Sequence, residues 1–212
     1  EGLKIKPFYR SSANENLIIK DIKPGFPPFS RGFNHNNNNW DIREDFNAEN
    51  IENANKQAVQ ALQKGANTVA FKTVFLNSDD ELAVLLKDID IEKTPVHFYS
   101  SESYSILAQL LINYIKKNNI DKMKVKGSFN FDSFGYYLLN GEYYNSLDDN
   151  INELACLINL CKNELPFFTV IQINGQHFSA AGADILQELS FSLASAHDYF
   201  YRLTEKGIKA ED

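Results

Sequence analysis

Apolar residues along the chain fall into two alternating patterns, short continuous runs and longer stretches with helical spacing. Short runs rich in β-branched and aromatic residues are typical of buried strands, and apolar residues that recur every three or four positions predict amphipathic helices. The pattern predicts strands at 40–46, 68–73, 95–99, 123–131 and 167–173. It predicts helices at 51–62, 78–86, 101–118, 147–165 and 185–203. The elements therefore form five successive strand–helix units.

Capping residues mark the ends of several of these helices. Asn47 is predicted as the N-cap of the first helix, and Gly65 as its end. Ser78 is predicted to cap the second helix, with Glu81 completing a capping box. Gly207 marks the end of the last helix. These residues support the division of the chain into strand–helix units.

Successive strand–helix units predict a parallel sheet with right-handed crossovers, and so an α/β fold. A doubly wound open sheet and a TIM-type barrel both allow this order of elements. No glycine-rich phosphate-binding fingerprint follows the first strand, which weakens the dinucleotide-binding alternative. Residues 1–39 contain a group of prolines and a run of asparagines at 36–39, so an irregular segment is predicted there.

The composition is that of a globular protein, with 212 residues of which 43% are hydrophobic and 23% charged. The net charge is −7 and acidic and basic residues are mixed, so the chain lacks the clustered basic face of a nucleic-acid-binding protein. No apolar run approaches the length of a membrane span. The chain opens without Met or the apolar segment of a signal peptide. We therefore expect neither nucleic acid nor a membrane as a partner.

The two cysteines, Cys156 and Cys161, lie in one predicted helix. We interpret both as small apolar core residues rather than as a disulfide or metal ligands. No group of His, Asp and Glu has metal-ligand spacing, so no metal site is expected. These features favour a reducing, cytoplasmic setting. His97 and His197 are interpreted as structural residues.

Three motifs resemble one known family. Residues 175–189 read GQHFSAAGADILQEL and resemble the G-Y-H-x-x-x-A-G-A-x-x-x-x-E-L-A signature of the methylmalonyl-CoA mutase barrel. Residues 24–32 read PGFPPFSRG and resemble that family's P-G-x-x-P-F-T-R-G, and residues 40–43 read WDIR and resemble its W-x-I-R. The motifs span nearly the whole chain in the family's order. The chain resembles most the small, non-catalytic subunit of the heterodimeric members.

This resemblance implies a TIM-type barrel rather than a doubly wound sheet. A complete (β/α)8 barrel needs about 250 residues, so we expect a partial barrel with about five of its eight units. Residues 1–39 would form an irregular N-terminal extension and residues 40–212 the barrel portion. The two terminal strands would be unpaired edges, which favour self-association of the fragment.

The resemblance also implies candidate site residues. His177 matches the family histidine that donates a hydrogen bond to the substrate thioester carbonyl, a catalytic role. Ser30 and Arg31 match the family's T-R-G and are candidates for binding a CoA-like substrate group. Catalytic members carry tyrosines between the R-G and W-x-I-R motifs, but residues 33–39 contain none. The family arginine that pairs with the substrate carboxylate falls on Asn140, which cannot neutralise that charge.

The resemblance therefore predicts a structural subunit that stabilises a larger catalytic mutase subunit. The intact enzyme would interconvert methylmalonyl-CoA and succinyl-CoA with adenosylcobalamin. The family binds that cofactor in a separate domain with a D-x-H-x-x-G motif, which is absent from this sequence, so no cofactor is expected in this chain. Two alternatives stay open: a divergent acyl-CoA mutase barrel with its own active site around His177, and a non-catalytic barrel that binds a CoA ester.

Overall fold

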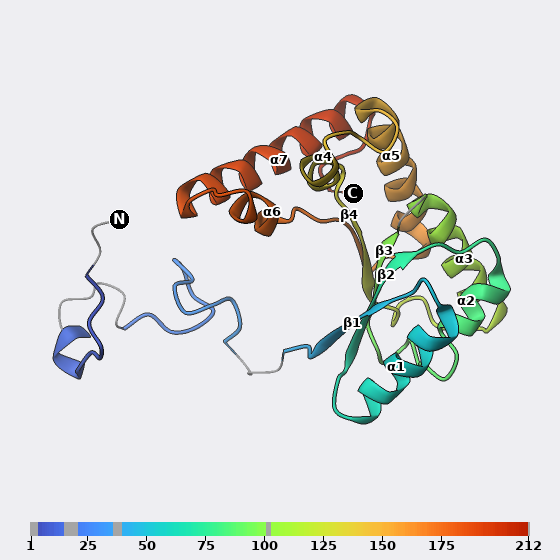
Figure 1. Cartoon of the computed structure of the whole chain (residues 1–212), viewed down its shortest axis with the longest axis horizontal. Helices are drawn as coiled ribbons and strands as arrows, with labels where there is room; N and C mark the ends of the chain where they lie inside the picture. Colours follow the sequence, from blue (N-terminus) through green and yellow to red (C-terminus); the bar gives the residue numbers. More distant parts are fainter. Residues whose placement is uncertain (1–3, 15–20, 36–39, 101–102, 212) are drawn as a thin grey trace. The chain divides into compact units, whose positions relative to one another are not determined.

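The computed structural model describes residues 4–14, 21–35, 40–100 and 103–211 (Figure 1). The chain divides into two compact units, Glu1–Trp40 and Asp41–Asp212, each of which has its own internal contacts. The second unit contains the sheet and the α-helices described below. No helix in the described ranges has the length and apolar character that crossing a membrane requires.

The second unit is built on a parallel sheet of five strands in the order β1-β2-β3-β4-β5. Each strand pairs with the next strand in the sequence, so the order does not reverse as it does in a doubly wound sheet. The sheet is not closed, because β1 and β5 lie at its opposite edges. The α/β prediction is confirmed, and the arrangement is consistent with a partial barrel. The strands are β1 (Arg43–Asn47), β2 (Thr68–Val74), β3 (Val96–Ser100), β4 (Gly127–Phe131) and β5 (Phe168–Ile171).

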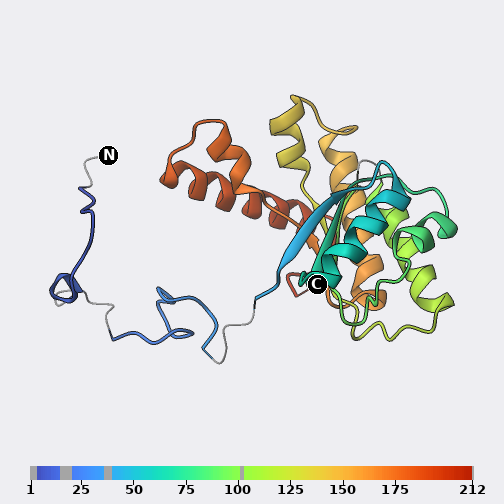
Figure 2. The ribbon, with the colours of Figure 1, turned by 60° about the horizontal axis from the view of Figure 1, so that its bottom comes forward.

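Helices alternate with these strands and divide into two groups. The first group covers one face of the sheet (Figures 1 and 2) and comprises α1 (Ile51–Gln63), α2 (Asp79–Leu85), α3 (Tyr104–Lys117) and α5 (Leu147–Glu164). The second group lies beyond the carboxyl ends of β4 and β5 and comprises α4 (Ser133–Asn140), α6 (Gly175–Ala180) and α7 (Ile185–Glu205). The predicted strand–helix units are thus present, with two short helices added to them.

A row of phenylalanine rings crosses the sheet on the face that the first group of helices covers. The centroids of Phe71 and Phe98 are 6.2 Å apart and those of Phe98 and Phe129 are 6.1 Å apart, and all three rings are fully buried. The row continues to Phe46 on β1 and to Phe168 on β5. Because side chains alternate between the faces of a strand, the opposite face carries the residues between these rings.

The predicted caps are only partly correct. Ser78 caps α2, since its Oγ accepts a hydrogen bond from the backbone N of Glu81 at 3.3 Å. A capping box would need the Glu81 carboxylate to accept from the backbone N of Ser78. The carboxylate accepts instead from the backbone N of Asn77, at 2.6 Å. The N-cap of α1 is Asn50 rather than Asn47, because Asn47 is the last residue of β1.

Element boundaries and two helices also differ from the prediction. Strand β4 begins at Gly127 rather than at 123, because the backbone N of Lys124 donates to the carbonyl of Asp121 and closes a turn. The predicted start of α3 at 101 lies outside the described residues, and α3 follows its N-cap Ser103. No helix is predicted for α4, and a loop is predicted where α6 lies. Gly141, with φ of 77°, ends α4.

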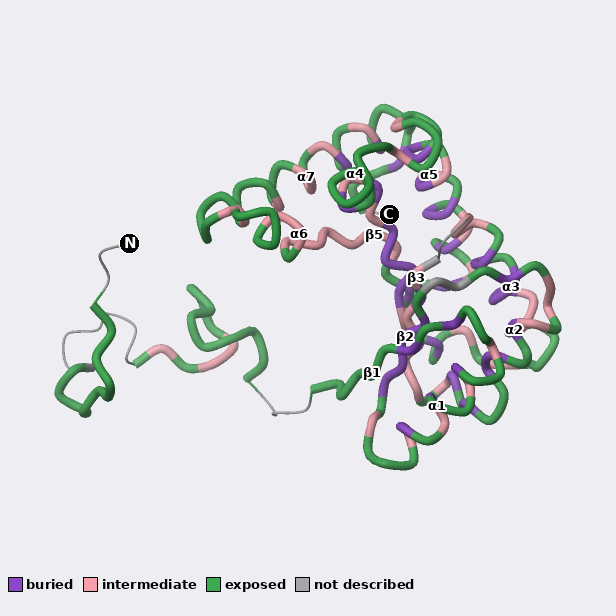
Figure 3. Tube along the Cα trace, viewed as in Figure 1, coloured by how far each residue is buried: buried purple, intermediate pink, exposed green. Residues whose placement is uncertain are grey.

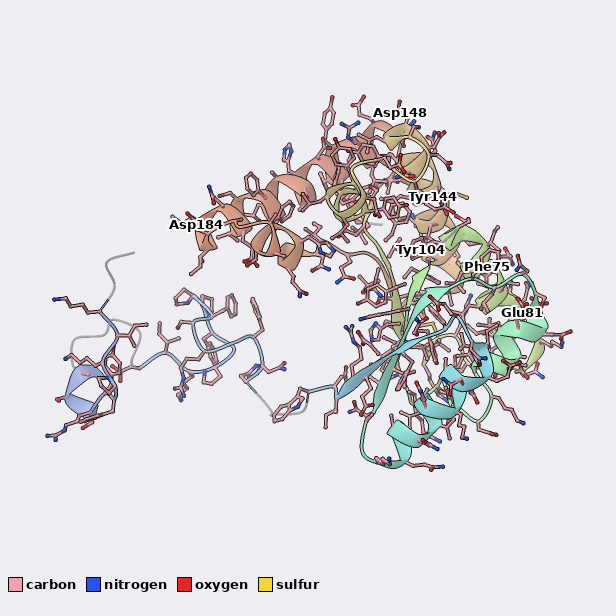
Figure 4. All side chains as sticks on the ribbon, viewed as in Figure 1. Phe75, Glu81, Tyr104, Tyr144, Asp148 and Asp184 are labelled. Atoms are coloured by element: carbon pink, nitrogen blue, oxygen red, sulfur yellow. The ribbon has the colours of Figure 1, made fainter. Side chains whose placement is uncertain are left out.

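The last helix is present as predicted, but most of its apolar stripe is exposed. Asp184 begins α7 (Figure 4) with a capping box, in which Asp184 Oδ1 accepts from the backbone N of Gln187 at 2.8 Å. Leu189 and Leu193 are 56% and 62% exposed, whereas Leu203 near the other end is 6% exposed. The first half of α7 extends away from the sheet and its surface is largely accessible (Figure 3).

The two cysteines of α5 have opposite environments. Cys161 is buried, as predicted, and burial raises the pKa of its thiol to about 12. Cys156 is exposed, so its prediction as a core residue is wrong. The helix turns by about 100° per residue, and a separation of five positions places the two side chains on different faces.

The first unit is folded by local backbone hydrogen bonds. The backbone N of Gly25 donates to the carbonyl of Gly32 at 2.8 Å, which closes a loop that contains Ser30 and Arg31. Within the loop, the backbone N of Phe29 donates to the carbonyl of Phe26 at 2.8 Å. A 3₁₀-helix, Ser11–Asn14, precedes it. The asparagine run at 36–39 lies outside the described residues.

Candidate functional site

Three polar residues meet where β4 and β5 end. Asp132 follows the last residue of β4, and Asn174 and His177 follow β5. In parallel α/β folds, ligands and catalytic groups collect at the carboxyl ends of strands. The strand order places β4 beside β5, so the residues that follow them are neighbours in space although they are distant in sequence. We take this group as the candidate site.

Asp132 joins the two strand ends. Its Oδ1 accepts a hydrogen bond from the backbone N of Gly135 at 2.9 Å, which caps α4, and its Oδ2 accepts from the backbone N of Asn174 at 3.2 Å. Burial raises the pKa of Asp132, while these two hydrogen bonds and the charge of His177 oppose the rise. The carboxylate therefore acts as a bridge between α4 and the segment after β5.

His177 lies in the first turn of α6 rather than in the predicted loop. The side-chain Nδ2 of Asn174 is 3.0 Å from His177 Nε2. The ring is half-buried and its Cδ2 side faces Gly135, where a Cβ would lie 2.9 Å from His177 Cδ2. Glycine at position 135 thus permits α4 to approach both Asp132 and the imidazole.

Tyr199 of α7 fastens the start of α4. Its hydroxyl lies 2.9 Å from Ser133 Oγ and accepts a hydrogen bond from the backbone N of Phe134 at 3.2 Å. The side chain is 2% exposed, and burial raises its pKa to about 12. This phenol is a neutral structural group, and it ties the helix after β5 to the helix after β4.

The sheet face opposite the phenylalanine row carries a cluster of charges. Asp45 of β1 accepts from Arg43 Nε at 3.0 Å and from Lys72 Nζ at 2.9 Å. Arg43 also donates to the hydroxyl of Tyr99 at 3.4 Å, and Lys72 Nζ lies 5.8 Å from the centroid of that ring. One carboxylate and one phenol thus engage both cations.

A second polar network lies next to this cluster, on β3 and β4. Nδ1 of His97 is 2.6 Å from Ser128 Oγ, which donates to Asn130 Oδ1 at 2.9 Å. Asn130 in turn donates to the carbonyl of Phe98 at 3.1 Å, so the network ends on the backbone. Burial, and then the charge of Arg43, lowers the pKa of His97. The structural role assigned to His97 fits these contacts, and His197 is exposed on α7.

The other two predicted site residues, Ser30 and Arg31, belong to the first unit, whereas His177 belongs to the second. Ser30 and Arg31 are exposed in the loop closed by Gly25 and Gly32. Asn140, the position to which the resemblance assigns the family arginine, lies at the end of α4 and donates to the carbonyl of Tyr136 at 2.8 Å. Its amide is thus used within its own helix.

The sequence predicts His177 as a site residue, but not Asp132 or Asn174. Asn174 belongs to the polar loop that the sequence predicts after the last strand. Its side chain reaches His177 only because residues from Gly175 onward form a helix, α6, which the sequence does not predict. Asp132 could have been found as an N-cap, because Asp is favoured at that position and there accepts a hydrogen bond from the backbone N of the third helical residue, which in α4 is Gly135. Over the residues that the structure describes, no group of three or more His, Cys, Asp or Glu side chains could hold a metal ion.

Comparison with known proteins connects these features to one family. The methylmalonyl-CoA mutase family model matches residues 1–73 and 69–212. The methylmalonyl-CoA mutase small subunit of Porphyromonas gingivalis is 32% identical over 216 residues, which cover 100% of this chain and 34% of that protein. Methylmalonyl-CoA mutase of Escherichia coli is 24% identical over 100% of this chain and 33% of that protein.

A relative named for a different acyl-CoA substrate also matches. The 2-hydroxyisobutanoyl-CoA mutase large subunit of Aquincola tertiaricarbonis is 29% identical over 132 residues, which cover 62% of this chain and 24% of that protein. The chain therefore spans about a third of the length of the mutases that it matches over its full length. With a family model that covers the whole sequence and a relative above 30% identity, the chain belongs to the methylmalonyl-CoA mutase family.

Proposed function

We propose that this chain is the barrel portion of a small mutase subunit that supports a larger catalytic subunit and does not itself catalyse. The larger partner would interconvert methylmalonyl-CoA and succinyl-CoA. The observation that carries the proposal is that both cations of the polar sheet face, Arg43 and Lys72, are paired with Asp45 within the chain.

Substrate recognition would need an available cation beside the hydrogen-bond donor of His177. Arg43 and Lys72 both pair with Asp45. The positive charge of each is therefore partly neutralised within the chain and would bind a substrate carboxylate more weakly than an unpaired cation would. Nε2 of His177 is engaged by Asn174. Asn140 occupies the position of the family arginine and bonds its own helix. Loss of positioning and charge pairing together removes much of the rate acceleration that an enzyme provides.

Adenosylcobalamin would be bound outside this chain in the parent enzyme. Ring nitrogens of His97 and His177 are hydrogen-bonded to neighbouring side chains, and the described residues gather no group of metal-ligating side chains. The free thiols of Cys156 and Cys161 support a cytoplasmic location, where thiols stay reduced.

The test is purification of the chain together with a larger homologous mutase subunit. A stable complex is expected, with no turnover by this chain when the cobalamin domain and cofactor are added, and no heat of binding with methylmalonyl-CoA in calorimetry. The variant His177→Ala should leave turnover by the complex unchanged. Failure of the two subunits to associate would contradict the proposal, and turnover by this chain that depends on His177 would support a divergent mutase instead.

A second candidate is a non-catalytic barrel that binds a CoA ester. The polar sheet face, with Arg43, Lys72 and His97, favours it because such a face could line a channel for a polar ligand. Ser30 and Arg31 would contact the same type of ligand. Heat of binding without turnover, lost in Lys72→Ala, would favour this function over the structural subunit.

A further inference from the structure

Asn174 occupies an N-cap position but does not cap its helix. The side chains of Asn50, Ser78, Ser103, Asp132, Ser146 and Asp184 each accept a hydrogen bond from a backbone N of the helix that follows. Asn174 precedes α6 and makes no such bond. Its side chain contacts His177 instead. An asparagine so well suited to capping is thus used for another purpose.

The geometry of this contact determines where the proton of the imidazole lies. Nδ2 of Asn174 is 3.0 Å from Nε2 of His177. An amide nitrogen only donates, so Nε2 has to accept through its lone pair. In a neutral imidazole the proton then lies on the other nitrogen, Nδ1.

The rest of the site holds Asn174 in this orientation. Its backbone N donates to Asp132 Oδ2 at 3.2 Å, and the other oxygen of Asp132 is held by Gly135. Because Gly135 has no Cβ, the Cδ2 side of the ring packs close to α4. The ring is thereby held with its Cδ2–Nε2 side toward α4 and Asn174. Nδ1 has no hydrogen-bond partner within the part of the chain that the structure describes.

We propose that Asn174 is a positioning residue that keeps the proton of His177 on Nδ1, and that Asp132 holds Asn174 in place. The inference goes beyond the proposed function, because it rests on the contacts of the His177 ring and not on the role of the chain in the larger enzyme. A carbonyl oxygen at this site would meet the Nδ1–H donor, and Nε2 would be unavailable to it. Asn174 thus decides which nitrogen of the histidine faces a ligand.

The experiment is long-range ¹H–¹⁵N NMR on the full chain, which distinguishes the two tautomers of each histidine by their nitrogen shifts. The chain has 4 histidines, and loss of one set of signals in His177→Gln assigns the relevant ring. The wild-type protein is expected to show the proton on Nδ1 of His177. A proton on Nε2 would overturn the proposal.

Two substitutions at Asn174 should move the proton in a defined way. Asn174→Ala removes the donor, and the ratio of Nδ1–H to Nε2–H should fall by about fivefold to tenfold, as expected for one lost hydrogen bond. Asn174→Asp replaces the donor by an acceptor, and the proton should move to Nε2. Asp132→Asn should shift the ratio in the same direction as Asn174→Ala, by a smaller factor.

Asn140→Ala and Asn140→Asp are matched controls, because Asn140 also donates from its side-chain amide but to a helix carbonyl. Neither should change the nitrogen shifts of His177. If the amide spectra show that both Asn174 variants are folded, an unchanged tautomer in the two variants would overturn the inference. This outcome is independent of the proposed function, which is tested by association with the larger subunit.

Discussion

His97 is a histidine whose surroundings disfavour its charged form. Burial is the main cause of its lowered pKa, and the charge of Arg43 adds to it, while Asp41 and Asp45 act in the opposite direction. Its Nδ1 is 2.6 Å from Ser128 Oγ, which passes the hydrogen bond on to Asn130. Because Ser128 donates to Asn130, Nδ1 has to be the donor to Ser128. His97 is therefore a neutral member of a directed network.

This environment predicts a loss of stability at mildly acidic pH. Below the ordinary histidine pKa of 6.5, the unfolded chain binds a proton at His97 that the folded chain does not bind. The free energy of unfolding should therefore decrease as the pH falls from about 7 to about 5. Urea denaturation at a series of pH values measures this free energy. In the His97→Gln variant, the free energy of unfolding should depend less steeply on pH between about 5 and 7.

The control for this prediction is His197→Gln, which removes an exposed histidine from α7. It should leave the dependence on pH nearly unchanged. If the two variants flatten the curve equally, the effect belongs to the overall charge of the protein rather than to the burial of His97.

Single residues also show what the sequence could reveal about the site. His177 was found because its motif is local, with glycine and histidine two positions apart and an alanine–glycine–alanine run after them. Asp132 lies 42 positions before Asn174, and only the pairing of β4 with β5 brings them together. Cys156 and Cys161 lie on different faces of α5, so residue type alone does not predict that Cys156 is exposed. Spatial partners of a motif residue are therefore harder to predict than the residue itself.

At the scale of elements, α4 depends on a residue from another helix. The hydroxyl of Tyr199 contacts Ser133 Oγ and the backbone N of Phe134, both in the first turn of α4. Tyr199→Phe keeps the ring but leaves these buried polar groups without a partner. We expect a loss of about 1–3 kcal/mol in the free energy of unfolding, measured by urea denaturation.

Tyr201→Phe provides the comparison, because Tyr201 is on the same helix and 57% exposed. Its stability should stay within about 0.5 kcal/mol of the wild-type value, as is usual for surface substitutions. Equal stability of the Tyr199→Phe variant and the wild type would show that the hydroxyl does not fasten α4.

The predicted strands and helices are all present, and the two helices that were not predicted, α4 and α6, lack a readable period. Helices α1, α3, α5 and α7 have clear apolar stripes, and β2 is a short β-branched run. Helix α4 reads SFGYYLLN and has apolar residues on all sides, so no helical stripe is visible. Helix α6 has six residues, too few to show a period. Both depend on tertiary contacts at the carboxyl ends of β4 and β5.

At the scale of the whole sheet, strand order separates the two folds that the sequence allowed. A doubly wound sheet reverses direction at a switch point, whereas β1 to β5 follow one another without reversal. Helices cover one face, and the opposite face carries the charged cluster of Arg43, Asp45 and Lys72. This is the arrangement of a barrel wall, in which one face packs on helices and the other faces the interior. The resemblance to a barrel family thus predicted what periodicity alone left open.

The open sheet and α7 together predict self-association of this chain. A groove of about 540 Å³ lies along β5 and is lined by residues of α5, β5 and the end of α7. On α7, Ile185 and Leu186 are 85% and 74% exposed, and Leu189 and Leu193 continue the same apolar surface. Between residues 185 and 196 the only charged side chain is Glu188, so little charge opposes the burial of this surface. Accessible apolar area of this kind favours association.

Sedimentation velocity over a range of concentrations measures this association. We expect the wild-type chain to form larger species as its concentration rises, and the double variant Leu189→Lys with Leu193→Lys to remain smaller at the same concentrations. The matched control places lysines at Ile106 and Met123, which are 56% and 55% exposed on other elements, and it should associate like the wild type. Equal sedimentation of the two double variants would assign any association to a surface other than α7. Burial of one leucine side chain of α7 in an interface would contribute about 1.5–3 kcal/mol, so replacing two leucines by lysines should weaken an association that uses this surface.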